Sequence, residues 1–188
     1  MCIYLNLMIF IEIIRGFLRA RYLIDEHNFI RLSFSDQLKK LASHIYPWME
    51  KDYLPEEKTL PINITLSTGE SIKHTARDIW LHLNKLREIE DRIFIRMLSE
   101  ELINLEERYK ETQNIIITDI RSNEEFIWSK NNGFIVIYIE RSNNHYEKYE
   151  IDKYINLNKP KSDYKFRNNE DGMGNFKAFI EEVFSSGY

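Results

Sequence analysis

The sequence predicts an α/β fold, in which helices pack in layers on a parallel β-sheet. Two runs dominated by β-branched residues, at 114–119 and 134–139, suit strands that are buried on both faces. The residues between these runs have the composition of a helix followed by an Asn-Asn-Gly turn. Strand–helix–strand spacing of this kind favours a right-handed crossover between two parallel strands.

The residues before these strands predict an alternation of strands and helices. An apolar, β-prone segment at 3–11 predicts a buried first strand, and the apolar spacing at 12–26 is typical of a helix. Residues 29–34 predict a second short strand. Asp36 follows this strand and is placed to cap a helix that runs toward Pro47.

The middle of the chain changes character twice. Residues 48–70 have no clear period, and three of the four prolines fall in or next to them, so we expect a loop-rich insert there. Residues 75–109 return to helical spacing, with a break near 88–91 that divides them into two helices. Thr75 and Asp78 predict a capping box at the start of the first.

The last third of the chain predicts two further helices. Residues 124–130 form the first, and the Asn-Asn-Gly turn at 131–133 ends it. From residue 163 the chain is rich in Asn, Asp and Gly, which predicts a polar loop. An amphipathic helix at 175–184 follows this loop.

The composition is that of an ordinary globular protein, with 188 residues of which 43% are hydrophobic and 30% charged. This length fits a single domain over 1–188. A net charge of −4 gives no reason to expect nucleic-acid binding, for which a basic surface is typical. Cys2 is the only cysteine, which excludes a disulfide within the chain and a thiolate zinc site. No two of the five histidines have the spacing of a helical zinc site.

The apolar stretch at 1–17 does not resemble a membrane segment. It is interrupted by Asn6, Glu12 and Arg15 and is too short to span a bilayer. It also lacks the basic region and the small-residue cleavage site of a signal peptide. We therefore expect a soluble, cytoplasmic protein that does not enter a membrane.

Charged pairs follow both buried strands, Asp119 with Arg121 and Glu140 with Arg141. In open parallel sheets, ligands bind at the carboxyl ends of the strands. Asp119 is placed there to hold a metal-bound water or to polarise a phosphate site, and Arg121 can offer a bidentate fork to a phosphate. The structural alternative is that Asp119 caps the following turn and that Arg121 forms a surface ion pair.

Arg77 falls in the first turn of a predicted helix. A cation there opposes the helix dipole and costs about half a kcal/mol. That cost is tolerable if the guanidinium reaches an anionic ligand. A salt bridge to Asp78 or Glu70 is the structural alternative.

Residues 33–36, Ser-Phe-Ser-Asp, close the second predicted strand. Their hydroxyls and the carboxylate of Asp36 can bind a sugar or a phosphate, and they serve equally well as helix caps. Phe34, Trp80 and Tyr53 are candidates to stack on a nucleotide base, and each is also suited to a core.

Four segments, in chain order, resemble those of the viral-type deoxynucleoside monophosphate kinases. Residues 29–39 resemble a strand and helix of pattern F-x-x-x-x-F-A-D-P-L-K, and residues 75–79 resemble T-P-R-E-x-L. Residues 116–125 resemble V-I-x-D-V-R-x-x-N-E, and residues 168–172 resemble the N-D-G segment before the last helix of that family. The resemblance therefore runs from the second predicted strand to the end of the chain.

This resemblance implies a P-loop NTPase architecture, a three-layer parallel sheet with helices on both faces. It implies transfer of the γ-phosphoryl group of ATP to a deoxynucleoside 5′-monophosphate, with Mg²⁺. Such transfer depends on positioning and electrostatics, which clustered arginines around a carboxylate provide. On this basis Arg77 and Arg121 hold phosphates, Asp119 organises the metal, and Arg141 lies on the lid side. A homodimer is the default by analogy with the fold.

The segment that should bind the donor phosphates departs from the family. Such kinases follow their first strand with G-x-x-x-x-G-K-[ST], whereas residues 9–19 hold one glycine, Gly16, and no lysine. Arg15 and Arg19 can supply charge, but their bulky neighbours disfavour an open nest of amides. Three interpretations stay open: a noncatalytic or impaired relative that binds a nucleotide or a partner protein, a modified donor site, or a start that differs from the family's through a shifted frame or misplaced initiation.

Overall fold

A computed structural model of the chain describes residues 6–11, 16–54, 56–65, 67, 69, 71–109, 113–141, 153–168 and 173–186. The chain divides into two compact units. The sheet unit combines Met1–Ser33 with Glu101–Tyr188, and the inserted unit is Phe34–Glu100. In the described parts of the chain, no helix is both long enough and apolar enough to cross a membrane.

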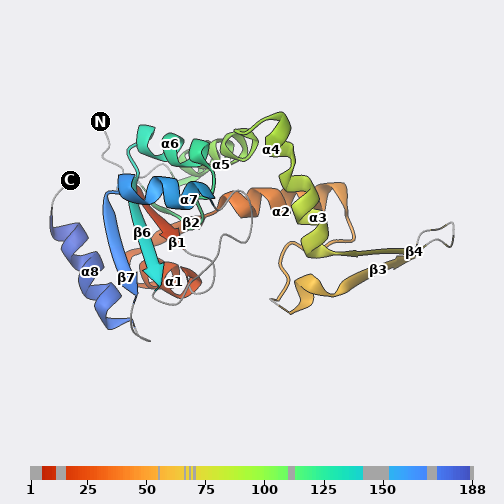
Figure 1. The fold of residues 1–188 in the computed structure, drawn as a ribbon, viewed down its shortest axis with the longest axis horizontal. Coiled ribbons are helices and arrows are strands. Elements are labelled where there is room, and N and C mark those ends of the chain that lie inside the picture. The colour runs from red at the N-terminus through yellow and green to blue at the C-terminus, as the bar shows by residue number, and fades with distance from the viewer. Residues whose placement is uncertain are drawn as a thin grey trace. The chain divides into compact units, whose positions relative to one another are not determined.

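The sheet unit is built on a five-stranded parallel β-sheet (Figure 1). Its strands are β1 (Asn6–Ile11), β2 (Phe29–Leu32), β5 (Asn114–Ile117), β6 (Ile135–Arg141) and β7 (Tyr164–Asn168). They lie in the order β2-β5-β1-β6-β7, and every neighbouring pair is parallel. The predicted α/β class and the parallel sheet are therefore present, although β1 separates the two strands that the sequence analysis linked by a crossover.

Strand β7 was not predicted, because residues 163–172 are polar enough to indicate a loop. Among the described residues, the strand lies at the edge of the sheet and pairs with β6 alone. Phe166 is buried, whereas its neighbours Lys165 and Arg167 are exposed. An edge strand with a single well-buried apolar side chain carries too short an alternation to be distinguished from a loop by sequence.

The helices of the sheet unit are α1 (Gly16–His27), α6 (Asn123–Asn131), α7 (Lys153–Asn158) and α8 (Gly174–Ser185), with a 3₁₀ turn, η3, at Lys159–Lys161. Helix α5 (Ile93–Tyr109) crosses from the inserted unit into this one. Helices α6 and α8 agree with the predicted segments to within a few residues, as does α1 from Gly16 on. Residues 12–15 of the first predicted helix lie outside the described residues.

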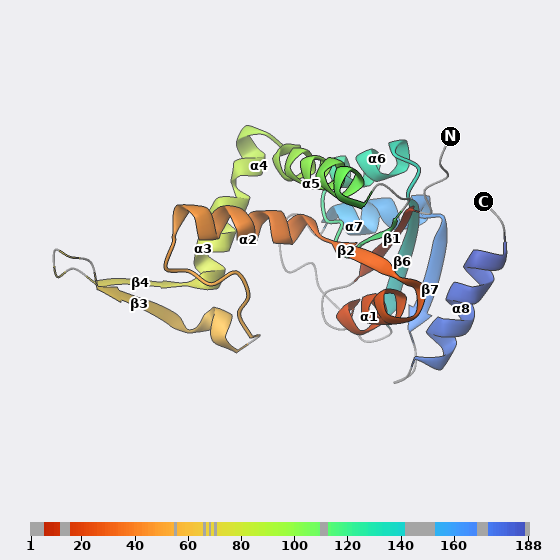
Figure 2. The same cartoon turned by 180° about the vertical axis from the view of Figure 1, so that it is seen from behind.

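Helices α1 and α8 share one hydrophobic core with the sheet (Figure 2). Ile116, Ile137 and Phe176 are fully buried in it. Ile117 and Val136, whose positions in the strands alternate with these and face the other side of the sheet, are fully buried as well. Strands β5 and β6 are thus buried on both faces, as predicted, while a complete helical layer on each face stays a prediction.

The inserted unit begins with α2 (Phe34–Ile45). Asp36 was predicted to cap this helix, but the helix starts two residues earlier and places Asp36 within its first turn. A carboxylate in the first turn is still favoured by the helix dipole. Thr75 and Asp78 form the predicted capping box at the start of α3 (Ala76–Asn84).

The rest of the inserted unit contains a hairpin that the sequence analysis did not predict. Strands β3 (Pro61–Thr65) and β4 (Ser71–Thr75) pair antiparallel, after a 3₁₀ turn, η1 (Glu57–Thr59). The hairpin pairs two five-residue segments, and the Ile-Asn-Ile alternation at 62–64 is too short to distinguish a strand from a loop by sequence. The predicted break near 88–91 is present, because α4 (Leu86–Ile89) ends there before α5 begins. A second break at Lys85 separates α3 from α4, so this segment holds three helices and not the two predicted.

Candidate functional site

The carboxyl edge of the parallel sheet gathers charged residues from three strands. Because all five strands are parallel, their carboxyl ends lie at the same edge. Asp119 and Arg121 follow β5, Glu140 lies at the end of β6, and Arg167 lies at the end of β7. The register pairs Glu140 with Arg167 across β6 and β7. This edge, within the sheet unit, is the candidate functional site.

The turn after β5 is held by a capping box. The backbone N–H groups of Arg121 and Ser122 donate to Oε2 of Glu125, at 2.8 and 2.9 Å. The hydroxyl of Ser122 accepts from the N–H of Glu125 at 3.1 Å. Ser122 is the N-cap of α6. Asp119 and Arg121 are both half-buried at the sheet edge.

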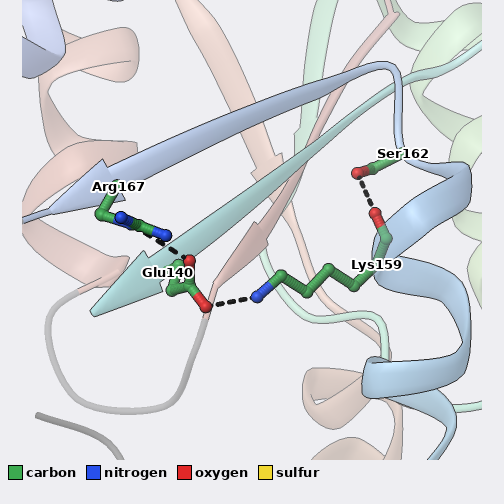
Figure 3. A network of polar contacts seen from close by, with 4 residues as sticks. All are labelled: Glu140, Lys159, Ser162 and Arg167. Carbon is green, nitrogen blue, oxygen red and sulfur yellow. Dashed lines mark hydrogen bonds and ion pairs between the residues drawn. The ribbon is translucent and has the colours of Figure 1, made fainter. Parts of the chain in front are cut away.

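Glu140 is the centre of a second cluster, drawn in Figure 3. One carboxylate oxygen accepts a hydrogen bond from the ammonium of Lys159 in η3. The other accepts from Nε of Arg167 at 3.4 Å. The Lys159 ammonium also lies 4.8 Å from the centre of the Tyr138 ring, a cation–π contact. The sequence analysis selected Glu140 but missed both cations, which come from segments that showed no motif.

The hydrogen bond from Lys159 lowers the pKa of Glu140 below its ordinary value of 4.5, against a smaller opposite effect of burial. The folded chain therefore takes up this proton less readily than the unfolded chain. The ionised carboxylate stabilises the fold above about pH 4.5, and this contribution is lost as the pH falls through the lowered pKa.

We expect the free energy of unfolding of the wild type to fall more steeply below about pH 4.5 than that of Glu140→Gln. Urea denaturation at a series of pH values measures this difference. Glu182→Gln, at an exposed position of α8, is the matched control and should keep the wild-type slope. Parallel curves for Glu140→Gln and the wild type would contradict the expectation.

Four predicted substrate-binding residues, Arg77, Asp36, Phe34 and Trp80, lie in the inserted unit. Arg77 occupies the first turn of α3, as predicted. Phe34 is only 1% exposed, so its ring is a buried group and is not available to stack on a base. The prediction for Phe34 is corrected for this reason: the first residue of α2 turns inward.

Trp80 and Asp36 belong to a small cluster around Lys39. The ammonium of Lys39 lies 3.5 Å from a carboxylate oxygen of Asp36 and 3.2 Å from one of Asp52. It also lies 5.7 Å from the centre of the Trp80 ring. Trp80 packs edge-to-face on Tyr53 at 5.9 Å. The two aromatic candidates thus contact each other, beside a cation held between two carboxylates.

The predicted donor-binding residues follow β1. Arg15 lies outside the described residues. Gly16 is the first residue of α1, and Arg19 lies on the same helix, one turn further along. Arg141 is the last residue of β6, where its backbone is in register with Asn168 of β7. Helix α1 follows β1 in the chain, and residues 12–15 between them lie outside the described residues.

The carboxyl edge offers part of what a magnesium nucleotide needs. Among the described residues, no group of three His, Cys, Asp or Glu side chains could hold a metal ion. Mg²⁺ in phosphoryl-transfer sites takes one or two carboxylates and completes its shell with phosphate oxygens and water. Asp119 at the sheet edge meets that requirement, and the guanidinium of Arg121 suits a phosphate. Asp119 and Arg121 therefore fit a nucleotide that carries Mg²⁺.

Comparison with known proteins places the fold. No family model and no curated protein matches this sequence. Among solved structures, the chain is similar to "Dephospho-CoA kinase from Campylobacter jejuni", with a TM-score of 0.51 and 14% sequence identity. The similarity covers 97% of this chain and 98% of that one. At this identity the likeness concerns the fold alone.

Proposed function

We propose that this protein is a nucleotide kinase that transfers the γ-phosphoryl group of ATP to a deoxynucleoside 5′-monophosphate. The observation that carries the proposal is the sheet order β2-β5-β1-β6-β7, with charged residues at its carboxyl edge. Ligands of open parallel sheets bind at this edge. The four segments that resemble deoxynucleoside monophosphate kinases supply the acceptor class.

The roles of the residues follow from the needs of phosphoryl transfer, which is governed by positioning and by stabilisation of charge. Arg121 neutralises charge on the transferred group from the turn after β5. Asp119 would hold the magnesium ion, which supplies positive charge between the phosphates when bound. Arg77, on α3 of the inserted unit, binds the acceptor phosphate. Arg141, at the end of β6, stabilises the negative charge of the transferred phosphoryl group, from the side on which such kinases have their lid.

Two observations bear on the identity of the acceptor. The structural neighbour is named for dephospho-CoA, which is also a nucleotide-containing acceptor. In this chain the resemblance of residues 29–39 and 75–79 favours the deoxynucleoside monophosphates. Both classes of acceptor therefore belong in one assay.

A noncatalytic relative that binds a nucleotide or a partner protein is the second candidate. It is favoured by one observation in the sequence: residues 12–16 read Glu-Ile-Ile-Arg-Gly and contain no lysine. A P-loop contributes a lysine that contacts the β- and γ-phosphates. Loss of that contact lowers turnover more than it lowers binding of the acceptor.

A coupled assay for ADP release tests the proposal. The purified chain is given Mg-ATP with a panel of the deoxynucleoside monophosphates and dephospho-CoA. We expect turnover that depends on one monophosphate and is absent with ATP alone. Turnover with dephospho-CoA alone would mean that dephospho-CoA, and not a deoxynucleoside monophosphate, is the acceptor. No turnover, with a monophosphate that still raises the melting temperature, would favour the noncatalytic candidate; binding at a hundred times Kd adds about 2.7 kcal/mol of stability.

A further inference from the structure

Any kinase of this fold must bind the polyphosphate of its donor, and the segment after β1 does not provide the usual cation. Residues 12–16 contain no lysine. The structure brings cations to the same edge from elsewhere in the sheet unit. Ile11, the last residue of β1, is in register with Ile139 of β6. Glu140 is therefore one residue beyond the end of β1, on the strand directly beside it.

Two cations converge on Glu140 at this place. Lys159 and Arg167 each bond one of its carboxylate oxygens. Figure 3 shows them approaching from two sides, Lys159 from the turn after α7 and Arg167 from the edge strand β7. The ion pair of Lys159 with Glu140 and its contact with the Tyr138 ring restrain the lysine. Such restraint reduces the conformational entropy that a side chain loses on binding a ligand.

The cluster has a surplus of positive charge and of donors. Among the described residues of this cluster, one carboxylate faces two cations, which leaves a formal charge of +1. An ammonium has three N–H donors and a guanidinium has five, so donors remain after each cation has bonded Glu140. The side chains of Glu140 and Lys159 are 30% and 31% exposed, and that of Arg167 is 69% exposed. The remaining donors can therefore reach a ligand from solvent.

We propose that Lys159 and Arg167, held in place by Glu140, form a binding site for the polyphosphate of a nucleoside triphosphate. The proposal deepens the proposed function, because it assigns the donor cation of that same sheet edge to η3 and β7. Glu140 is a positioning residue: it orients the two cations and keeps the empty site from carrying two uncompensated charges. Hydrogen bonds from charged donors to phosphate oxygens are the stronger kind.

The competing explanation is that the cluster only ties η3 and β7 to β6. Under that explanation, a change at Lys159 lowers stability but leaves the affinity for phosphate compounds unchanged. Under the proposal, affinity changes even when stability does not. Lys161, two residues along the same turn, bonds Asn158 and takes no part in the described contacts of Glu140. Replacing Lys161 by glutamine therefore removes the same charge as Lys159→Gln, but outside the cluster.

The experiment is isothermal titration of the full chain with inorganic tripolyphosphate, ATP and adenosine, each with the melting temperature of the protein recorded. We expect Lys159→Gln to lower the affinity for tripolyphosphate and for ATP by tenfold or more. We expect Lys161→Gln to change these affinities by less than about threefold. Lys159→Arg should restore most of the affinity. Adenosine should bind all variants alike. Arg167→Gln, at an exposed position that tolerates change, should weaken tripolyphosphate by about threefold to tenfold.

Unchanged affinity of Lys159→Gln for tripolyphosphate, or equal losses in Lys159→Gln and Lys161→Gln, would overturn the site. No binding of tripolyphosphate by the wild type would do so as well. The outcome is separate from that of the kinase assay. A chain that binds tripolyphosphate through Lys159 without turnover keeps the site and loses the kinase proposal, whereas turnover that Lys159→Gln leaves intact keeps the kinase and loses the site.

Discussion

Replacing Arg121 by alanine is expected to lower kcat by roughly 10²- to 10³-fold, the effect of removing one donor aimed at developing charge. The side chain is half-buried in the turn after β5. The turn itself is held through the backbone N–H of Arg121, which donates to Glu125. Since alanine keeps that N–H, the substitution removes the guanidinium while leaving the capping box of α6 in place.

The kinase assay with the preferred acceptor measures this effect, together with the melting temperature of the variant. Arg108→Ala, at an exposed position near the end of α5, is the matched control and should keep wild-type activity. Arg121→Lys should recover only part of the rate, because an ammonium lacks the bidentate geometry of the guanidinium. Activity of Arg121→Ala within about threefold of the wild type would remove Arg121 from the site.

Phe176→Ala is expected to destabilise the sheet unit by about 3–5 kcal/mol, the usual range for truncating a buried phenylalanine. Phe176 is fully buried in the core that α1 and α8 form with the sheet. Its ring contacts those of Phe166, at 5.4 Å, and Tyr22, at 6.4 Å, both edge-to-face. The residue thus joins the last helix to β7 and to the first helix.

Thermal and urea denaturation measure this loss, which corresponds to a melting temperature lower by roughly 10 °C for a chain of this size. Ile127→Ala is the control: its side chain on α6 is 42% exposed, and we expect a change within about 0.5 kcal/mol. A loss below about 1 kcal/mol for Phe176→Ala would mean that α8 does not contribute to the core as described.

Strands β5 and β6 were predictable because burial on both faces requires an unbroken apolar run, which few other structures need. The capping box of Thr75 and Asp78 was predictable because it is made by residues three apart in sequence. Strand β7 and the β3–β4 hairpin were not predicted, since both depend on strand pairing that a short segment does not show by itself. Strand β7 pairs with β6, which is distant in the chain, and β3 pairs with the next strand, β4.

The residues of the candidate site likewise divide into those that the sequence predicts and those that it does not. Asp119 and Arg121 could be selected because they follow a strong strand, and the carboxyl ends of parallel strands are where ligands bind. Phe34 was misassigned because sequence does not tell whether an aromatic residue at a helix start faces inward. Lys159 and Arg167 carry no local signal, because each is one of many cations in polar segments.

The fold class and the position of the β5 turn could be read from the sequence, because hydrophobic pattern and capping are local properties. The place of β1 between β5 and β6, and the compact unit formed by residues 34–100, emerge from the folded chain and not from any local pattern. It alone brought Lys159 and Arg167 to Glu140, across 19 and 27 residues of chain. Such contacts depend on which strands become neighbours, and strand order is fixed by packing of the whole sheet, not by any segment alone.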